Sequence, residues 1–323
     1  MTPEAQPCCV PSTGAARTPA PTPVVAERTV SHRGQVLIPG GRFRLGDAFD
    51  EGYPADGETP VHEVELQDFH IDVTAVTNAS FATFVKATKH VTTAETEGFS
   101  AVFHLDYRGD GSDVVGQASG APWWLVVRGA NWRHPEGAGS EMSRRQSHPV
   151  VHVSHHDALA YAAWAGKSLP TEAQWEAAAR GGLVGARFPW GDELMARGRW
   201  QCNIFQGEFP SANDGDDGWL STAPVKSYRP NGYGLYQMAG NVWEWCADWF
   251  AADYYDGIEI RDPVGPDSGD ARVMRGGSFL CHDSYCNRYR VAARSSSPPD
   301  STASNLGFRC GGSRLPPPRT FAT

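Results

Sequence analysis

The chain has 323 residues, a formal net charge of −9 and a sequence pI near 5.6. This length suffices for one large domain or two ordinary ones, and the acidic balance gives no electrostatic reason to expect nucleic-acid binding. No apolar run approaches the roughly 18 residues that a membrane span needs, and the N-terminus lacks the pattern of a signal peptide, so we expect no membrane association.

The composition predicts a compact fold with short elements. Glycine (35) and proline (24) are plentiful, but so are aromatic residues, among them 11 tryptophans. Glycine and proline without aromatic residues would indicate disorder, whereas this mixture favours many turns around an aromatic core. The seven cysteines are an odd and unevenly spread set, which argues against a disulfide framework. We therefore expect a reducing compartment and a cytoplasmic protein.

Three parts are predicted along the chain. Residues 1–32 are rich in proline, alanine and threonine and lack periodicity, which is typical of a disordered tail. Residues 33–315 are expected to form one large α+β domain, and residues 316–323 a short C-terminal tail. At the start of the domain, residues 34–46 predict a strand, a turn and a second strand, and residues 63–72 alternate as one further strand.

Three helices are predicted. Residues 78–88 carry apolar side chains at helical spacing. Ser154-His-His-Asp157 can form a capping box before a helix over residues 158–165. Thr171-Glu-Ala-Gln174 can cap another helix that runs to Arg180. Beyond this helix regular patterning fades and turn dipeptides dominate, so we expect an irregular domain with little regular secondary structure.

The most informative segment holds two cysteines, Cys281 and Cys286, five positions apart. A thiolate pair is a soft donor set that selects Cu(I), zinc or iron–sulfur clusters, and it can also cycle between dithiol and disulfide. The surrounding glycines, hydroxyl, tyrosine and arginines favour an open polar cleft over a packed core. The spacing matches neither C-x-x-C nor a zinc ribbon, so two inert thiols in a loop is the alternative.

Two stretches could supply oxygen ligands to calcium. Residues 213–218 are acidic, and Asn203-Ile204 lies just upstream, but the pattern is not an EF-hand and a solvated acidic loop is the simpler interpretation. In residues 237–245, Gln237 and Glu244 are oxygen donors beside a tight glycine turn. There the alternative is a pair of core tryptophans with a surface glutamate.

Several motifs together resemble one family. Four of them are shared broadly within it: Leu169-Pro-Thr-Glu-Ala-Gln-Trp-Glu176, Gly240-Asn-Val-Trp-Glu-Trp245, Arg275-Gly-Gly-Ser-Phe279 and Asn305-Leu-Gly-Phe-Arg309. Three narrower ones are residues 202–210, 281–290 and 292–305. The chain thus resembles the formylglycine-generating branch, bacterial type, of the sulfatase-modifying-factor family, over about residues 34–315.

The resemblance implies a fold and an activity. The fold would be a single large irregular domain, a distant variant of the C-type-lectin-like fold. The activity would be an aerobic, copper-dependent oxidation of the cysteine in a Cys-x-Pro-x-Arg motif to Cα-formylglycine. Its partners would be O2 and an unfolded or nascent polypeptide of the type I sulfatase kind.

The resemblance also assigns residues. Cys281 and Cys286 match the family's Cu(I) ligands, and Ser278 and Trp243 match residues that line its oxygen pocket. Candidate peptide-binding residues are Tyr285, Arg288 and Asn305. Two structural calcium ions map onto Asn203, Ile204, Asp217 and Trp219 for the first, and onto Gln237, Gly240, Val242 and Glu244 for the second.

Two other functions fit parts of the pattern. A non-catalytic lectin-like binding module could use the same fold and the four broad motifs, because fold alone does not give function. An iron-dependent sulfoxide synthase of the same superfamily would need an extra helical domain with metal-binding histidines, which the sequence does not contain. The paired Cys281 and Cys286 favour the oxidase, since a binding module has no need of two thiolates.

Overall fold

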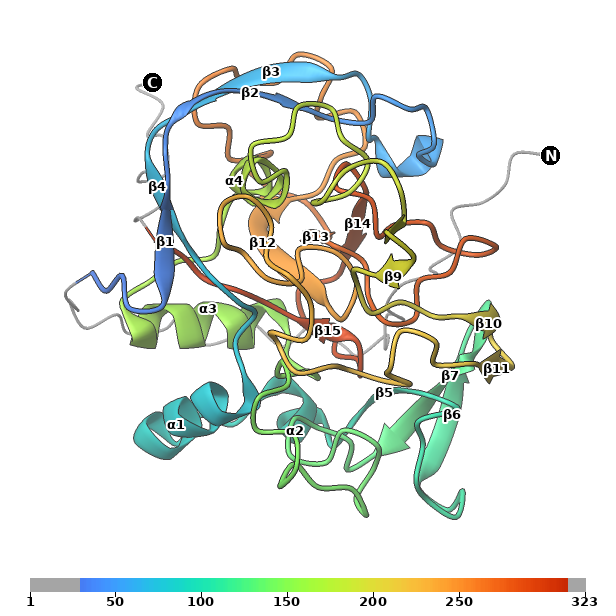
Figure 1. The fold of residues 1–323 in the computed structure, drawn as a ribbon. Helices are drawn as coiled ribbons and strands as arrows, with labels where there is room; N and C mark the ends of the chain where they lie inside the picture. The colour runs from blue at the N-terminus through green and yellow to red at the C-terminus, as the bar shows by residue number, and fades with distance from the viewer. Residues whose placement is uncertain (1–29, 313–323) are drawn as a thin grey trace.

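The computed structural model describes residues 30–312 (Figure 1). The predicted tails, residues 1–32 and 316–323, lie outside the described residues except for positions 30–32. At that edge Ser31 N donates a hydrogen bond to Gly166 O, and the His32 ring stacks on His70 at 3.7 Å between centroids. No helix in residues 30–312 is both long and apolar enough to cross a bilayer.

Regular structure consists of short pieces. Between residues 30 and 312 the helices are α1 (Asn78–Thr88), α2 (Thr93–Glu97), α3 (His155–Ala165) and α4 (Glu172–Ala179), with a 3-10 turn η1 (Pro54–Asp56). The strands are β1 (Gln35–Ile38), β2 (Gly41–Leu45), β3 (His62–Leu66), β4 (Phe69–Asp72), β5 (Phe99–Phe103), β6 (Val114–Ala118), β7 (Ala121–Arg128), β8 (Met195–Ala196), β9 (Arg199–Trp200), β10 (Gly207–Glu208), β11 (Ala212–Asn213), β12 (Trp243–Trp249), β13 (Arg272–Arg275), β14 (Arg294–Ser297), β15 (Leu306–Gly307) and β16 (Gly311–Gly312).

The predicted helix signals are confirmed. Helix α1 spans the predicted residues and is capped by the side chain of Thr77. Capping boxes start the other two, Ser154 with Asp157 for α3 and Thr171 with Gln174 for α4. In each box the side chains and backbone N–H groups of the two residues satisfy each other, so two of the unpaired donors at the helix start are used.

One strand prediction is wrong. Residues 63–72 were expected to form a single strand, but they form β3 and β4, which pair separately with β2 and β1. The break falls at Gln67 and Asp68, whose side chains are used elsewhere. Asp68 Oδ1 accepts a hydrogen bond from Gly40 N at 2.7 Å, and the Gln67 amide binds the carboxylate of Asp262. These contacts bend the ribbon from β1 and β4 towards β2 and β3 (Figure 1).

A four-stranded sheet, in the order β14-β13-β12-β15, lies at the centre of the molecule (Figure 1). Strands β12 and β13 are antiparallel, with Glu244 opposite Arg275, and β12 runs parallel to β15, with Trp243 opposite Leu306. Helix α4 packs on this sheet, while α1 and α2 lie with β5–β7 at the other end of the molecule from β2 and β3. The sheet therefore gathers segments that are far apart in the sequence.

Buried ion pairs fix α4 to the central sheet. Arg275 is fully buried, with one guanidinium nitrogen 3.0 Å from Glu172 Oε1 and another on the carboxylate of Glu176. Arg294 binds the same Glu172 at 2.7 and 3.0 Å. Burial opposes ionisation of Glu176, but Arg275 and Arg180 overcome it and lower its pKa to about 2. The carboxylate is therefore charged at neutral pH and depends on its arginine partners.

We predict that Glu176→Gln destabilises the protein by about 3–5 kcal/mol, because it leaves Arg275 buried with too little negative charge. The measurement is urea unfolding at pH 7. The exposed pair Arg42–Glu65, at 4.0 Å, provides the control, and Arg42→Ala should cost less than about 1 kcal/mol. Equal losses in the two variants would contradict the account.

The same carboxylate makes stability depend on pH. Because the folded-state pKa of Glu176 is depressed, its contribution to the free energy of unfolding is complete above the pKa of the unfolded state, about 4.3. That contribution is lost as the pH falls towards 2.

Candidate functional site

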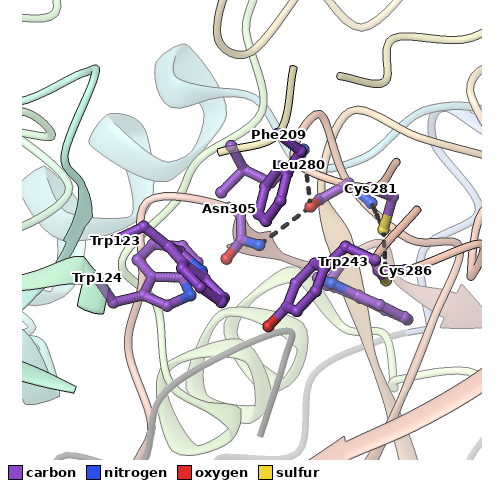
Figure 2. Close-up of a pocket in the computed structure, with 10 residues that line it drawn as sticks. Trp123, Trp124, Phe209, Trp243, Leu280, Cys281, Cys286 and Asn305 are labelled. Atoms are coloured by element: carbon purple, nitrogen blue, oxygen red, sulfur yellow. Dashed lines mark hydrogen bonds between the residues drawn. The ribbon is translucent and has the colours of Figure 1, made fainter. Parts of the chain in front are cut away.

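A narrow pocket lies where β7, β12 and the cysteine segment meet (Figure 2). Its volume is about 10 Å³, which is room for one water-sized group. It is lined mostly by aromatic and sulfur-containing side chains, namely Trp123, Trp124, Phe209, Trp243, Ser278, Leu280, Cys281, Tyr285, Cys286 and Asn305. A larger molecule could therefore enter the pocket only with one small terminal group.

Two glycines directly after β13 shape the cysteine segment. Gly276 and Gly277 have φ values of +93° and +71°, a region that L side chains rarely adopt. A Cβ on Gly277 would lie 2.8 Å from the backbone oxygen of Arg288. The absence of side chains thus lets the chain turn sharply and pack against its own return. This turn brings Cys281 next to Cys286.

The two sulfurs lie 3.1 Å apart. This separation is well beyond the ~2.05 Å of a disulfide, and both residues are cysteine thiols in this structure. Cys281 Sγ accepts a hydrogen bond from Ser278 N at 3.4 Å, and Arg288 Nη1 lies 3.7 Å from Cys286 Sγ. The pair is therefore held by a backbone donor on one side and a guanidinium on the other.

The prediction of an open polar cleft is wrong. Cys281 and Cys286 are only 1% and 2% exposed, and they pack in the main apolar core with Trp243 and Tyr289. Ser278 and Tyr285 line the pocket, but the arginines of the segment do not. Arg290, for example, binds the Glu58 carboxylate at 2.7 and 2.8 Å. The arginines that suggested a cleft are thus paired inside the fold.

Arg288 links the cysteine pair to the N-terminal part of the chain. Two of its guanidinium nitrogens bind the Asp56 carboxylate, and the group also stacks 4.3 Å above the Tyr53 ring. Burial raises the pKa of Asp56, and the hydrogen bond to Arg288 opposes that effect. Arg288 touches Cys286 but does not line the pocket, unlike Tyr285 and Asn305, the other candidate peptide-binding residues.

Next to the cysteines, the pocket wall joins Ser278, Asn305 and Trp243. Asn305 Nδ2 donates to Ser278 Oγ at 3.0 Å, as the dashed line in Figure 2 marks, and Trp243 N donates to Asn305 O at 2.9 Å. The indole N–H groups of Trp243 and Trp124 are buried and bind no acceptor in the part of the chain that the structure describes. Both are therefore available to an acceptor on a molecule in the pocket.

Sequence reasoning missed the aromatic wall formed by Trp123, Trp124 and Phe209. Tyr285 stacks on Phe209 at 4.6 Å between centroids, and its ring meets Trp123 edge-on at 4.9 Å. Figure 2 shows the two tryptophans on one side of the pocket and the cysteines on the other. Adjacent tryptophans in a short strand were the available signal, but nothing in the sequence placed β7 beside the cysteine segment.

The first predicted calcium set is assembled in one place and suits a hard cation. Asn203 Oδ1 is buried and has no hydrogen-bond partner among residues 30–312. Asp217 accepts hydrogen bonds from Ile204 N and Trp219 N, both at 2.9 Å, and the Gln206 amide lies on its carboxylate and on Ile204 O. Burial raises the pKa of Asp217. A bound cation would take the unpaired Asn203 Oδ1 as a ligand, and its charge would oppose the rise in the pKa of Asp217.

The second predicted set does not fit calcium as it is arranged here. Both Glu244 oxygens bind the Arg309 guanidinium, at 2.6 and 2.8 Å, and one also accepts from Trp175 Nε1 at 2.7 Å. Gln237 uses its amide on Pro224 O and on Asn241. A guanidinium therefore already neutralises the carboxylate that the ion would need. Among the described residues no three His, Cys, Asp or Glu side chains are grouped to hold a metal.

Comparisons with known proteins place the chain in a family. The model of the sulfatase-modifying factor enzyme 1-like domain matches residues 21–312. The formylglycine-generating enzyme of Streptomyces coelicolor is 67% identical over 300 residues, covering 93% of this chain and 94% of that protein. That of Thermomonospora curvata is 57% identical over 281 residues, covering 86% and 93%. The chain therefore belongs to the sulfatase-modifying-factor family, as its motifs predicted.

A solved structure shares the fold. PvdO from Pseudomonas aeruginosa is 24% identical and has a TM-score of 0.63, covering 86% of this chain and 93% of that one. With the family match, this confirms the predicted fold class of a single irregular α+β domain. The family also has members named as inactive. A Bos taurus inactive C-alpha-formylglycine-generating enzyme 2 is 42% identical over 289 residues, covering 88% and 89%. The site itself must therefore support any activity.

We predict that Gly277→Ala destabilises the protein and separates the cysteines, because a methyl group would strike the Arg288 carbonyl. The control is Gly234→Ala, which has a similar φ of +82° but no atom within 4 Å of the added Cβ. Urea unfolding should show a loss about 1–3 kcal/mol larger for Gly277→Ala than for the control. If the two losses are equal, backbone conformation alone explains the glycine.

Proposed function

We propose that this protein is a copper-dependent aerobic oxidase. It would convert the cysteine of a Cys-x-Pro-x-Arg motif in type I sulfatases to Cα-formylglycine. The observation that carries the proposal is the Cys281–Cys286 thiol pair, with its sulfurs 3.1 Å apart and both residues lining one small pocket. The names of the two bacterial relatives support the same chemistry.

The donor set fits Cu(I). Two cysteine sulfurs form a soft pair suited to low coordination, whereas structural zinc takes four ligands. No third His, Asp or Glu side chain within residues 30–312 completes a tetrahedral set with Cys281 and Cys286. Bound Cu(I) would supply a redox centre that can also accept the thiolate of the substrate cysteine. The backbone N–H of Ser278 and the Arg288 guanidinium would hold the two protein sulfurs in place.

The protein would position the substrate and exclude water. The ring of Tyr285 packed between Phe209 and Trp123 makes an apolar wall that shields the substrate CH2–SH group. The unused indole N–H groups of Trp124 and Trp243 can donate hydrogen bonds to reduced oxygen or to a substrate carbonyl. Directed donors in a dry pocket act more strongly than donors in water, so this wall would stabilise developing negative charge.

The overall chemistry balances with O2 as the acceptor. Loss of two electrons and two protons from the substrate CH2–SH group gives a thioaldehyde, while O2 takes up both to form hydrogen peroxide. Water then replaces the sulfur, which yields the aldehyde and hydrogen sulfide. Two more electrons from an external thiol reductant would carry the peroxide to water. The role of the protein is to present the substrate thiol and to admit O2.

We also propose that the enzyme works in the cytoplasm on unfolded or nascent polypeptides. A pocket of about 10 Å³ would take only the thiol end of a side chain, which an extended segment presents more readily than a folded surface does. Cys202, Cys246 and Cys310 are fully buried thiols, which suits a reducing compartment. Burial raises the pKa of each of these three thiols, so they stay protonated and unreactive.

The function is tested by mass spectrometry of a Cys-x-Pro-x-Arg peptide incubated with the protein, Cu(I), a thiol reductant and air. We expect formylglycine with wild-type protein and none with Cys281→Ser or Cys286→Ser, because each variant removes one copper ligand. Cys246→Ser is the matched control, a buried cysteine outside the pocket that should keep full conversion. Conversion by either ligand variant at the wild-type rate, with stoichiometric copper, would refute the proposed site. A well-folded wild-type protein that converts no peptide would favour a binding module.

We propose one structural calcium ion at Asn203, Ile204, Asp217 and Trp219. EGTA should then lower the melting temperature, because an ion that binds only the folded state stabilises it, by about 2.7 kcal/mol at a hundredfold excess over Kd. Asp217→Asn should weaken this response. The control Asp216→Asn changes an exposed neighbour in the same loop and should leave the response intact. An identical EGTA response in both variants would show that Asp217 is no ligand.

A further inference from the structure

A second small cavity lies apart from the cysteine pocket, between the start of α1, the turn after β5 and the segment of residues 135–151. Its volume is about 20 Å³, and its lining residues are Asn78, Asp106, Pro135, Glu136, Met142, Arg145, Pro149, Val151, Ser221, Thr222, Phe279 and Ser304. None of these residues has a part in the proposed oxidation or in the calcium sets above. The space is large enough for one water molecule or one monatomic ion, but not for an organic ligand.

Asn78 directs an unsatisfied oxygen into this region. The residue is 2% exposed, and its Nδ2 donates a hydrogen bond to Arg145 O at 2.8 Å. That bond fixes the orientation of the amide, because the reversed amide would place an oxygen against the Arg145 carbonyl. Asn78 Oδ1 is consequently buried, and no donor from residues 30–312 reaches it.

Asp106 adds a carboxylate to the same cavity. It is 6% exposed, and across the described chain its carboxylate accepts no hydrogen bond, although its backbone N–H binds Phe103 O. Burial first, and then the neighbouring Glu136, raise the pKa of Asp106 to about 7. An ionised carboxylate without a partner is disfavoured in such a place, so Asp106 is either protonated or neutralised by a cation.

Nearby charges leave the cavity net negative. Glu136 is the second carboxylate, and one of its oxygens pairs with Arg145 Nη2 at 2.5 Å. Arg145 offsets one of the two carboxylates, and Arg108 is exposed and binds backbone oxygens of Leu105 and Tyr107. About one negative charge therefore faces a space of one ion. A single water molecule offers only two protons to the Asn78, Asp106 and Glu136 oxygens, whereas a cation attracts all of them.

We propose that this cavity binds one divalent hard cation of the calcium class, with Asp106, Asn78 and Glu136 as side-chain ligands. Oxygen donors in mixed carboxylate and amide sets are those that Ca²⁺ takes, and the hydroxyl groups of Thr222 and Ser304 border the same space. Only two of these ligands are acidic, so the set contains no group of three His, Cys, Asp or Glu side chains.

Such an ion would brace the wall of the cysteine pocket. Phe279 directly follows Ser278, and Ser304 directly precedes Asn305, the two residues joined by the hydrogen bond at the pocket wall. Ser304 Oγ also accepts a hydrogen bond from Phe103 N at 3.3 Å. The ion would thus connect the start of α1 to the turn after β5, in a cavity that Phe279 and Ser304 border. Its removal should lower thermal stability.

The test counts bound metal in the full-length protein. Wild type, Asp106→Asn, Asp217→Asn and the double variant are equilibrated with CaCl2 and, separately, MgCl2, and their metal content is measured by native mass spectrometry. We expect Asp106→Asn to lose one equivalent of one of these ions, additively with the loss in Asp217→Asn. Asp110→Asn, an exposed carboxylate in the same segment, is the control and should lose none.

Asn78→Ala provides a second variant in case Asp106→Asn does not fold, as judged by circular dichroism. It should weaken metal binding at this site at least tenfold in a titration with a fluorescent chelator. If folded Asp106→Asn or Asn78→Ala keeps the wild-type metal content and affinity with both ions, the cavity holds only water and the proposal is overturned. Because the readout is metal content, the result does not depend on the oxidase activity.

Discussion

The arrangement of the site depends on buried guanidinium groups. Arg275, Arg294 and Arg309 are fully buried, and each binds a glutamate from α4 or β12. Because the strands are short and the irregular segments are long, few backbone hydrogen bonds align one segment with another. Buried charge pairs of fixed geometry align them instead. Such pairs add little net stability compared with apolar packing, but removing one partner is costly. They therefore specify one arrangement of the chain. In that arrangement β13 leads directly into the cysteine segment.

The chemistry of the pocket follows from this alignment. Gly277 lets the chain double back at the end of β13, and the turn places two thiols in contact inside an aromatic shell. Arg288 pairs with Asp56 and also contacts Cys286, so it connects the buried ion pairs to the cysteine site. The same residues that stabilise the fold thus position the sulfurs. The pairing of Glu244 with Arg309 shows the opposite case, in which a carboxylate expected to hold calcium is used by the framework instead.

Local features of the fold could be predicted from the sequence, and contacts between distant segments could not. The capping boxes at Ser154 and Thr171 use neighbouring residues, so the helices were predicted closely. The break between β3 and β4 depends on Asp262, nearly 200 residues away, and no periodicity reveals it. The cysteine pair could also be recognised in the sequence, but its burial could not be predicted. The arginines beside it pair with residues from the other end of the chain, such as Asp56, and the sequence does not reveal those contacts.

The proposed mechanism requires that the buried thiol pair bind Cu(I) and that the substrate thiolate add a further ligand. The most direct measurement is a titration of Cu(I) into the metal-free protein against a competing chelator. It is carried out alone, with a Cys-x-Pro-x-Arg peptide, and with the same peptide carrying serine for cysteine. The account predicts that copper affinity rises with the cysteine peptide and is unchanged with the serine peptide. Equal affinity in all three titrations would contradict it.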